Sequence, residues 1–348
     1  MVKVLVTGGS GFIAVHIIDL LFQKGYDVVT TVRSESKAEF LKTKFAGKPL
    51  ETAIVPDISV EGAFDEVVKT PGIVYVLHTA SPFHFKTTHA NPLPTSNYLD
   101  LINPAVTGTT SIIKAIGASA PAVKHVVVTS SFASIMDRKH LDSSTTFTEE
   151  SWNPDTVEDA KTDIVVAYCA SKVLAEKAAW QTVKDLGSPF ALTTVCPPIV
   201  YGPVAHQLTS FSEINTSNNF MVQLLNGEWK DAIPSEFGSP IWIEVRDVAK
   251  AHVLALEKKA AKGQRLFTTA GYYSNQKIAK IVYDNFPEKR HLLPNPEAAG
   301  EKSTADLFKF NNEKTKQILG FEWTPLEKTI KDLAQSLIDL ESKLNKAS

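Results

Sequence analysis

Cysteine is scarce in this sequence, because its 348 residues include only Cys169 and Cys196, far apart and without a CxxC spacing. This excludes a disulfide framework and a cysteine-based zinc site, and a reducing compartment is the simplest interpretation. Excess charge is also lacking, since 36 Lys and Arg residues stand against 38 Asp and Glu residues. The formal net charge of −2 gives no electrostatic footprint for nucleic acid, so small molecules are the expected partners.

Long hydrophobic runs are missing as well. No stretch approaches the roughly 18 uninterrupted apolar residues of a membrane span. The apolar start of the chain is too short for a signal peptide and continues directly into glycines, so we expect a cytoplasmic protein. With 43% hydrophobic residues the chain can bury a large core. Because single cores usually divide beyond roughly 250–300 residues, we expect two lobes.

Short β-branched runs alternate with segments of helical period through the first half of the chain. The runs at 74–77 and 126–128 are apolar throughout, as strands covered by helices on both faces must be. The pattern predicts an α/β fold of Rossmann type, a doubly wound parallel sheet. The predicted strands are 2–6, 28–32, 54–55, 73–77, 126–129 and 192–195.

After Cys196 the sequence changes to loops rich in proline, glycine and asparagine, with short helices between them. A helix at 248–256 and a strand at 265–269 are expected to return to the first lobe. The predicted domains are an NADP-binding Rossmann domain of residues 1–196 plus about 241–270, and a smaller, discontinuous C-terminal substrate lobe of residues 197–240 and 271–348.

A glycine turn follows the first predicted strand and opens the first helix. The segment Gly8-Gly9-Ser10-Gly11-Phe12-Ile13-Ala14 has GxxGxxA spacing in the βαβ context that a dinucleotide fingerprint requires. Gly8 lets the chain turn sharply, Gly11 lets the backbone approach a pyrophosphate, and Ala14 permits close packing of helix on strand. The turn predicts a dinucleotide site, and a glycine turn without a ligand is the alternative.

No carboxylate stands at the end of the second predicted strand, where NAD-preferring sites usually place Asp or Glu. Arg33 and Lys37, one helical turn apart, would favour a dianionic 2′-phosphate, so NADP(H) is the expected cofactor. The alternative is that both side chains are merely solvated. Asp57 and Ile58, after the third strand, could accept from the adenine amino group and cover its ring.

Tyr168 and Lys172 lie four residues apart in a segment of helical period, which puts phenol and ammonium on one face. A nearby cation favours phenolate and lowers the pKa of a phenol toward the working range, so Lys172 is expected to tune Tyr168. A second such pair, Tyr273 and Lys277, also exists. Because Ser274 is an expected N-cap, that second pair should not share a helical face.

A buried strand over 126–129 is followed by the hydroxyls of Ser130 and Ser131. Ligands of open α/β sheets bind outside the carboxyl ends of the strands, so these hydroxyls should face the cofactor crevice. Ser131 could donate to a substrate carbonyl while charge develops on its oxygen. For either serine taken alone, satisfying backbone groups at the strand end is the alternative.

Together these motifs resemble an extended short-chain dehydrogenase/reductase. Within that superfamily the sequence is similar to the yeast NADPH-dependent methylglyoxal and isovaleraldehyde reductases, which are related to plant dihydroflavonol and cinnamoyl-CoA reductases. The EESWNP at 149–154 strengthens this resemblance. The matches run in family order: TGGSGFIA at 7–14, VRSESK at 32–37, PDIS at 56–59, LHTASP at 77–82, TSS at 129–131, YCASK at 168–172, PPIVYGP at 197–203 and VRDVAKAH at 245–252.

The resemblance implies NADPH-dependent reduction of aldehydes or ketones to alcohols. It makes Ser131 the carbonyl-orienting hydroxyl, Tyr168 the proton donor, and Lys172 both the tuner of Tyr168 and a ligand of the nicotinamide ribose. One departure is Cys196-Pro197, where relatives often have Asn-Pro. The implied cofactor contacts are Gly8, Gly9, Ser10, Gly11, Phe12 and Ile13 at the pyrophosphate, Arg33 and Lys37 at the 2′-phosphate, Asp57 and Ile58 at adenine, and Ala80, Val200 and Ser217 at nicotinamide.

The substrate pocket is expected where the second lobe closes over Tyr168. Apolar walls with few fixed polar groups would select carbonyl compounds by shape, although ordinary core packing is the alternative for each wall residue. Three histidines, His78, His84 and His89, have no recurrent ligand spacing, so no metal is expected. The candidate walls are Phe83, Phe85, Phe132, Val166, Pro198, Ile199 and Tyr201.

Two other functions remain open. A nucleotide-sugar epimerase or dehydratase of the same fold would return the hydride and keep its cofactor, but Arg33 and the apolar walls count against it. A non-catalytic NADP sensor would need the glycine turn and would have no use for Ser131, Tyr168 and Lys172 together. The expected partner is a small carbonyl compound, with no nucleic acid and no membrane, and the expected state is a monomer or homodimer.

Overall fold

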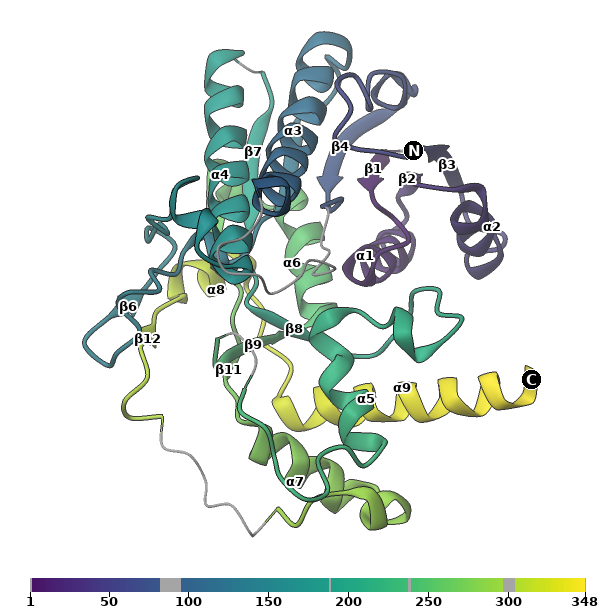
Figure 1. Cartoon of the computed structure of the whole chain (residues 1–348). Helices are drawn as coiled ribbons and strands as arrows, with labels where there is room; N and C mark the ends of the chain where they lie inside the picture. Colours follow the sequence, from purple (N-terminus) through teal and green to yellow (C-terminus); the bar gives the residue numbers. More distant parts are fainter. Residues whose placement is uncertain (1, 82–94, 188, 237–238, 297–303, 348) are drawn as a thin grey trace.

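A seven-stranded sheet, parallel in every strand pairing, forms the centre of the molecule's first lobe (Figure 1). The computed structural model describes residues 2–81, 95–187, 189–236, 239–296 and 304–347. The strand order is β10-β7-β5-β4-β1-β2-β3, which confirms the predicted doubly wound Rossmann-type fold. The strands are β1 (Lys3–Thr7), β2 (Asp27–Val32), β3 (Leu50–Ile54), β4 (Ile73–His78), β5 (His125–Thr129), β7 (Ala191–Val195) and β10 (Arg265–Leu266).

Helices cover both faces of this sheet. One face carries α1 (Phe12–Gln23), α2 (Glu35–Lys44) and α6 (Val245–Glu257), and the other carries α3 (Thr95–Ser119) and α4 (Ile164–Asp185). Alternate residues of β1 pack into the two layers, since Val4 and Val6 lie on the α1 side and Leu5 on the α3 side. A strand buried on both faces has no exposed polar side, which is why the centres of β1 and β5, Val4–Val6 and Val126–Val128, are apolar.

A smaller lobe lies below the sheet in Figure 1, on the side toward which the central strands point. Its three-stranded sheet contains β8 (Ile199–Tyr201), β9 (Ile241–Glu244) and β11 (Gly271–Tyr272). Its main helices are α5 (Asn219–Leu225), α7 (Asn275–Asn285) and α9 (Leu326–Ala347). Met221, Ile278 and Leu333, one from each helix, share a core. The predicted division assigns β9 to the Rossmann domain, whereas β9 pairs with β8 and β11.

The remaining regular elements are short. They are α8 (Glu313–Leu319), the paired strands β6 (Thr146–Phe147) and β12 (Lys309–Phe310), and the 3-10 helices Val67–Lys69, Phe132–Ser134, Asp159–Lys161, Phe211–Glu213, Thr216–Asn218, Lys259–Ala261 and Pro287–Leu292. Among the residues that the structure describes, none of the helices is both long and apolar enough to cross a membrane.

Two predicted strands differ from the structure, and both lie at sheet edges. The third strand was predicted at 54–55 but occupies Leu50–Ile54, because an edge strand with half-exposed residues needs no apolar run. The strand predicted at 265–269 ends at Leu266. Beyond it, Asn312 Nδ2 donates to the carbonyl oxygens of Phe267 and Thr269 at 3.1 and 2.8 Å, so a side chain replaces the next sheet partner.

Candidate active site

The glycine turn between β1 and α1 lies at the carboxyl edge of the sheet. Gly8 has a φ of +70°, which favours glycine, and a Cβ on it would lie 3.0 Å from Ala80 Cα. A Cβ on Gly9 would lie 1.9 Å from Thr30 Oγ1. Gly11 is the N-cap of α1, and no side chain caps the helix there. The turn therefore offers closely approachable backbone and a positive helix end to an anionic group.

The residues predicted to bind the adenosine half of the cofactor follow two neighbouring strands, β2 and β3. These strands pair with each other, and Val32 at the end of β2 lies opposite Ile54 at the end of β3. Arg33 is exposed and Lys37 half-buried, and neither forms an ion pair with a residue that the structure describes. Asp57 Oδ1 accepts from the backbone N–H and the hydroxyl of Ser59 at 2.8 and 2.6 Å, and these hydrogen bonds lower the pKa of Asp57.

Three predicted catalytic side chains meet beyond the end of β5. Helix α4 begins at its N-cap Asp163, whose carboxylate accepts from the first helical N–H groups, so Tyr168 and Lys172 fall on successive turns of one face. The Ser131 hydroxyl lies within hydrogen-bonding reach of the Tyr168 phenol, and this contact lowers the pKa of the phenol. Lys172 Nζ lies 5.5 Å from the centroid of the Tyr168 ring and donates to Ser81 Oγ at 2.7 Å.

Burial controls the electrostatics of this trio. Desolvation raises the pKa of Tyr168 to about 12, and the hydrogen bond with Ser131 offsets only part of that increase. Desolvation likewise lowers the pKa of Lys172 to about 8. Burial is the largest influence on the pKa of Tyr168 in this structure, and the lowering of that pKa by Lys172 stays a prediction.

A cavity of about 20 Å³, large enough for one water molecule, lies beside Lys172. Thr7 Oγ1 accepts from two backbone N–H groups, so its own proton goes to His78 Nδ1 at 2.9 Å, and His78 carries its proton on Nε2. That buried Nε2 has no hydrogen-bond partner among the described residues. The cavity is lined by His78, Ala80, Ser81, Ala105, Thr109, Val128, Thr129, Ser130, Lys172, Ala175 and Glu176.

Sequence reasoning missed Ser81, Glu176 and Arg265. Ser81 was already inside a motif that matches the family, but nothing in the motif indicates that it accepts from Lys172. Glu176 could have been found, because it follows Lys172 by four residues, the spacing that separates Lys172 from Tyr168. Arg265 has no local signal, since its partner Glu176 is 89 residues away along the chain.

The predicted pocket walls divide into two groups. Val166, Pro198 and Ile199 are half-buried. Phe132 and Tyr201 are only 2% and 3% exposed. Phe132 stacks on Phe267 with ring centroids 5.2 Å apart, and Tyr201 packs in the core of the second lobe, so ordinary core packing accounts for these two rings. Phe83 and Phe85, and the histidines 84 and 89, lie outside the described residues.

Other predicted positions can be placed as well. Ser217 Oγ donates to the carbonyl oxygen of Val200 at 2.7 Å, which brings together two of the residues predicted at nicotinamide. Ser274 is the N-cap of α7 and accepts from Lys277 N at 3.1 Å, as predicted, while Tyr273 is buried in the core of the second lobe.

Within the described ranges, no group of three or more His, Cys, Asp or Glu side chains is arranged to hold a metal ion.

Residues 4–268 match the model of the NAD dependent epimerase/dehydratase family. The chain is 39% identical over 351 residues to the NADPH-dependent methylglyoxal reductase of Saccharomyces cerevisiae, with 98% of this chain and 100% of the relative covered. It is 34% identical over 339 residues to a cinnamoyl-CoA reductase of Medicago truncatula, with 96% of this chain and 95% of the relative covered.

The solved structures agree with these sequence relatives. The yeast methylglyoxal/isovaleraldehyde reductase complexed with NADPH superposes with a TM-score of 0.86 at 38% identity, over 98% of this chain and 99% of that one. A UDP-glucose 4-epimerase from Bifidobacterium longum superposes with a TM-score of 0.69 at 21% identity, over 98% of each chain, a likeness of fold alone.

Proposed function

Because this chain belongs to the NAD dependent epimerase/dehydratase family, among the extended short-chain dehydrogenases/reductases, we propose that it is an NADPH-dependent carbonyl reductase acting on aldehydes or ketones. The observation that carries the proposal is the convergence of the Ser131 and Tyr168 hydroxyls, with the Lys172 ammonium 5.5 Å from the centroid of the Tyr168 ring. The three groups lie where open α/β sheets bind their ligands.

The described residues fit NADPH. The Gly8–Ile13 turn suits a pyrophosphate, because Gly8 has a close backbone neighbour and the first turn of α1 has no side-chain cap. Arg33 and Lys37, free of ion pairs among the described residues, would hold the 2′-phosphate, as NADPH rather than NADH requires. Asp57 and Ile58 would hold adenine, Lys172 the nicotinamide ribose, and Ala80, Val200 and Ser217 the nicotinamide.

NADPH, when bound, supplies the hydride that reduces the carbonyl carbon. Tyr168 keeps its proton at neutral pH, because burial raises its pKa to about 12, and Tyr168 Oη donates that proton to the carbonyl oxygen. Ser131 Oγ donates a hydrogen bond to the same oxygen, where negative charge develops. Lys172 beside the ring stabilises the phenolate that remains after proton transfer.

The substrate would bind between the trio and the second lobe. Val166, Pro198 and Ile199 are half-buried and can contribute apolar walls. We propose a cofactor domain of residues 1–196 plus about 245–270 and a substrate lobe formed by the rest, which includes β9 because this strand pairs with β8 and β11. We place the protein in the cytoplasm, which its two buried free cysteines support, and we propose a monomer or homodimer.

The test is a turnover assay of the purified chain. Protein, NADPH and either methylglyoxal or isovaleraldehyde are mixed, and the loss of NADPH absorbance is followed together with the alcohol formed. We expect stoichiometric oxidation of NADPH by the wild type and a loss of activity of about 10²–10⁴-fold in the Tyr168→Phe variant. A parallel reaction with UDP-glucose and NAD+ or NADP+ in place of NADPH identifies an epimerase, which would convert the sugar without net reduction of the nicotinamide.

Tight NADPH binding without oxidation by either aldehyde, or by an aryl ketone, would overturn the proposal and favour a dinucleotide sensor. Conversion of the nucleotide sugar alone would favour the epimerase.

A further inference from the structure

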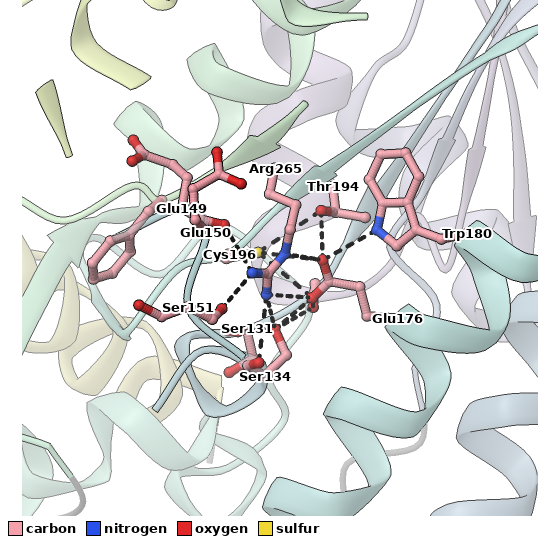
Figure 2. A network of polar contacts seen from close by, with 12 residues as sticks. Ser131, Ser134, Glu149, Glu150, Ser151, Glu176, Trp180, Thr194, Cys196 and Arg265 are labelled. Carbon is pink, nitrogen blue, oxygen red and sulfur yellow. Dashed lines mark hydrogen bonds and ion pairs between the residues drawn. The ribbon is translucent and has the colours of Figure 1, made fainter. Parts of the chain in front are cut away.

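Glu176 is a buried carboxylate on α4, one helical turn after Lys172 and two turns after Tyr168, and it is 2% exposed. Its Oε2 atom accepts from the hydroxyls of Ser130 and Ser134, each at 2.5 Å. Its Oε1 atom accepts from Thr194 Oγ1 at 2.8 Å. Figure 2 shows the Glu176 carboxylate with Ser134, Thr194 and Arg265 around it. So many donors on one carboxylate fix its position.

The two serines bonded to Glu176 stand on either side of Ser131. Ser134 N donates to the carbonyl oxygen of Ser131 at 3.0 Å, and Ser134 Oγ lies 2.7 Å from that same oxygen. Ser131 Oγ in turn accepts from Ala133 N at 3.1 Å. The segment 130–134 is therefore held to α4 by one carboxylate, with Ser131 in the middle of the segment and Tyr168 on the helix.

Arg265, from β10, balances the charge of this carboxylate. Its Nε donates to Glu176 Oε1 at 2.7 Å, its guanidinium donates to the carbonyl oxygens of Glu149 and Ser151 at 2.8 and 2.5 Å, and it stacks 3.7 Å from the centroid of the Trp152 ring. Burial alone would raise the pKa of Glu176, but the charge and hydrogen bonds of Arg265 together with the hydrogen bonds of Ser130 and Ser134 outweigh burial and hold that pKa below its ordinary value. Glu176 is therefore an anion, and it accepts hydrogen bonds from the three hydroxyls and from the guanidinium of Arg265.

We propose that Glu176 is a positioning residue of the reductase: by binding Ser130 and Ser134 it sets the separation between the Ser131 and Tyr168 hydroxyls. The inference rests on the proposed function of those two groups. Catalytic rate is sensitive to displacements of about 1 Å in groups that must meet one reacting atom. A buried ion pair is a poor source of stability by itself, so stability alone gives little reason for this arrangement.

The test compares substitutions that each remove one hydroxyl donor from the same carboxylate. Ser130→Ala and Ser134→Ala loosen the segment that carries Ser131, whereas the matched control Thr194→Val loosens only the contact with β7. The variants avoid Glu176→Gln, which would leave Arg265 buried without its partner and risk loss of folding. Each variant is studied as the NADPH complex, and its folding is checked by thermal unfolding.

We expect kcat of the two serine variants to fall about tenfold or more, with the KM for NADPH unchanged, while Thr194→Val stays within about twofold of the wild type. In the reverse direction, alcohol oxidation, Tyr168 must act as a base. The hydrogen bond from Ser131 lowers the pKa of Tyr168, so the midpoint of the pH profile should move to higher pH in the serine variants only. Equal losses in all three variants, or no shift of the midpoint, would overturn the inference.

Crystal structures of the NADPH complexes separate this inference from the proposed function. The distance between Ser131 Oγ and Tyr168 Oη should lengthen in Ser130→Ala and Ser134→Ala and stay constant in Thr194→Val. This distance can be measured without turnover, so an inactive wild type would refute the reductase while the distance still decides the role of Glu176. An unchanged distance in the serine variants refutes that role.

Discussion

Lys172 Nζ lies 5.5 Å from the centroid of the Tyr168 ring, one helical turn along α4, so cation and phenol share one face of a helix whose N-cap is Asp163. The phenol in turn meets the Ser131 hydroxyl at the end of β5. Every group that the proposed proton transfer needs is therefore fixed by two elements, one strand end and one helix.

Tyr168→Phe should lower kcat for carbonyl reduction by about 10²–10⁴-fold, the range for loss of a general acid, because only the phenolic hydroxyl is removed. The dissociation constant for NADPH, measured by fluorescence titration, should stay within about threefold, since the hydroxyl acts mainly in the transition state. Tyr273→Phe is the matched control, as Tyr273 is buried in the core of the second lobe. Retained kcat in the Tyr168 variant would contradict its role.

Arg33→Ala should raise the KM for NADPH by about 10–100-fold and leave the KM for NADH nearly unchanged. A hydrogen bond to a charged group is worth about 1.5–3 kcal/mol, and only NADPH carries the 2′-phosphate that Arg33 would bind. Lys42→Ala is a suitable control, because Lys42 lies on α2 but pairs with Glu39 at 2.7 Å. Parallel changes in the two KM values would show that Arg33 has no part in cofactor preference.

Much of the fold was predictable because its signals are local. Of the first six predicted strands, five begin and end within one residue of their predicted bounds, since a strand buried on both faces is mostly apolar. The glycine turn was equally predictable, because its spacing reports a backbone requirement that Gly8 meets with a φ of +70°. The edge strand β3 was displaced in the prediction, since half-exposed residues carry no such pattern.

The site was less predictable wherever it depends on burial or on distant residues. Sequence spacing put Tyr168 beside Lys172, but only the packing around them shows that desolvation raises the phenol's pKa to about 12. The ion pair of Glu176 with Arg265 joins residues 89 positions apart, which no periodicity reports. Phe132 shows the same limit, because an aromatic beside a catalytic motif can be a pocket wall or core, and its contacts place it in the core.

Gly9→Ala should destabilise the fold by about 1–3 kcal/mol, as overpacking of a tight core does, because the new Cβ would lie 1.9 Å from Thr30 Oγ1. Thr30→Ala removes that atom and also its hydrogen bond to the carbonyl oxygen of Val6 at 2.7 Å. The double variant should therefore lose less stability than the sum of the two single variants, measured by urea unfolding. Strict additivity would show that the two residues do not collide.

His252 should make the fold sensitive to acid. His252 Nδ1 donates to the carbonyl oxygen of Val248 at 2.8 Å, because a carbonyl oxygen can only accept. In the neutral ring Nε2 therefore accepts from Thr129 Oγ1 at 2.7 Å. Burial lowers the pKa of His252 to about 4. An unfolded histidine has a pKa of about 6.5, so between these values the unfolded chain binds a proton that the folded chain does not. The contribution of His252 is complete above pH 6.5 and is lost as the pH falls toward 4.

For one group this loss is about 2 kcal/mol between pH 7 and pH 5. His252→Gln keeps one donor and one acceptor but cannot titrate. From pH 7 to pH 5 the free energy of unfolding of this variant should therefore fall by about 2 kcal/mol less than that of the wild type. Urea unfolding at pH 7 and pH 5 measures the difference. The pKa values of His78 and His125 are also lowered to about 4 by burial, so part of the acid sensitivity should remain in the variant. An identical fall in both proteins would mean that His252 titrates alike in the folded and unfolded states.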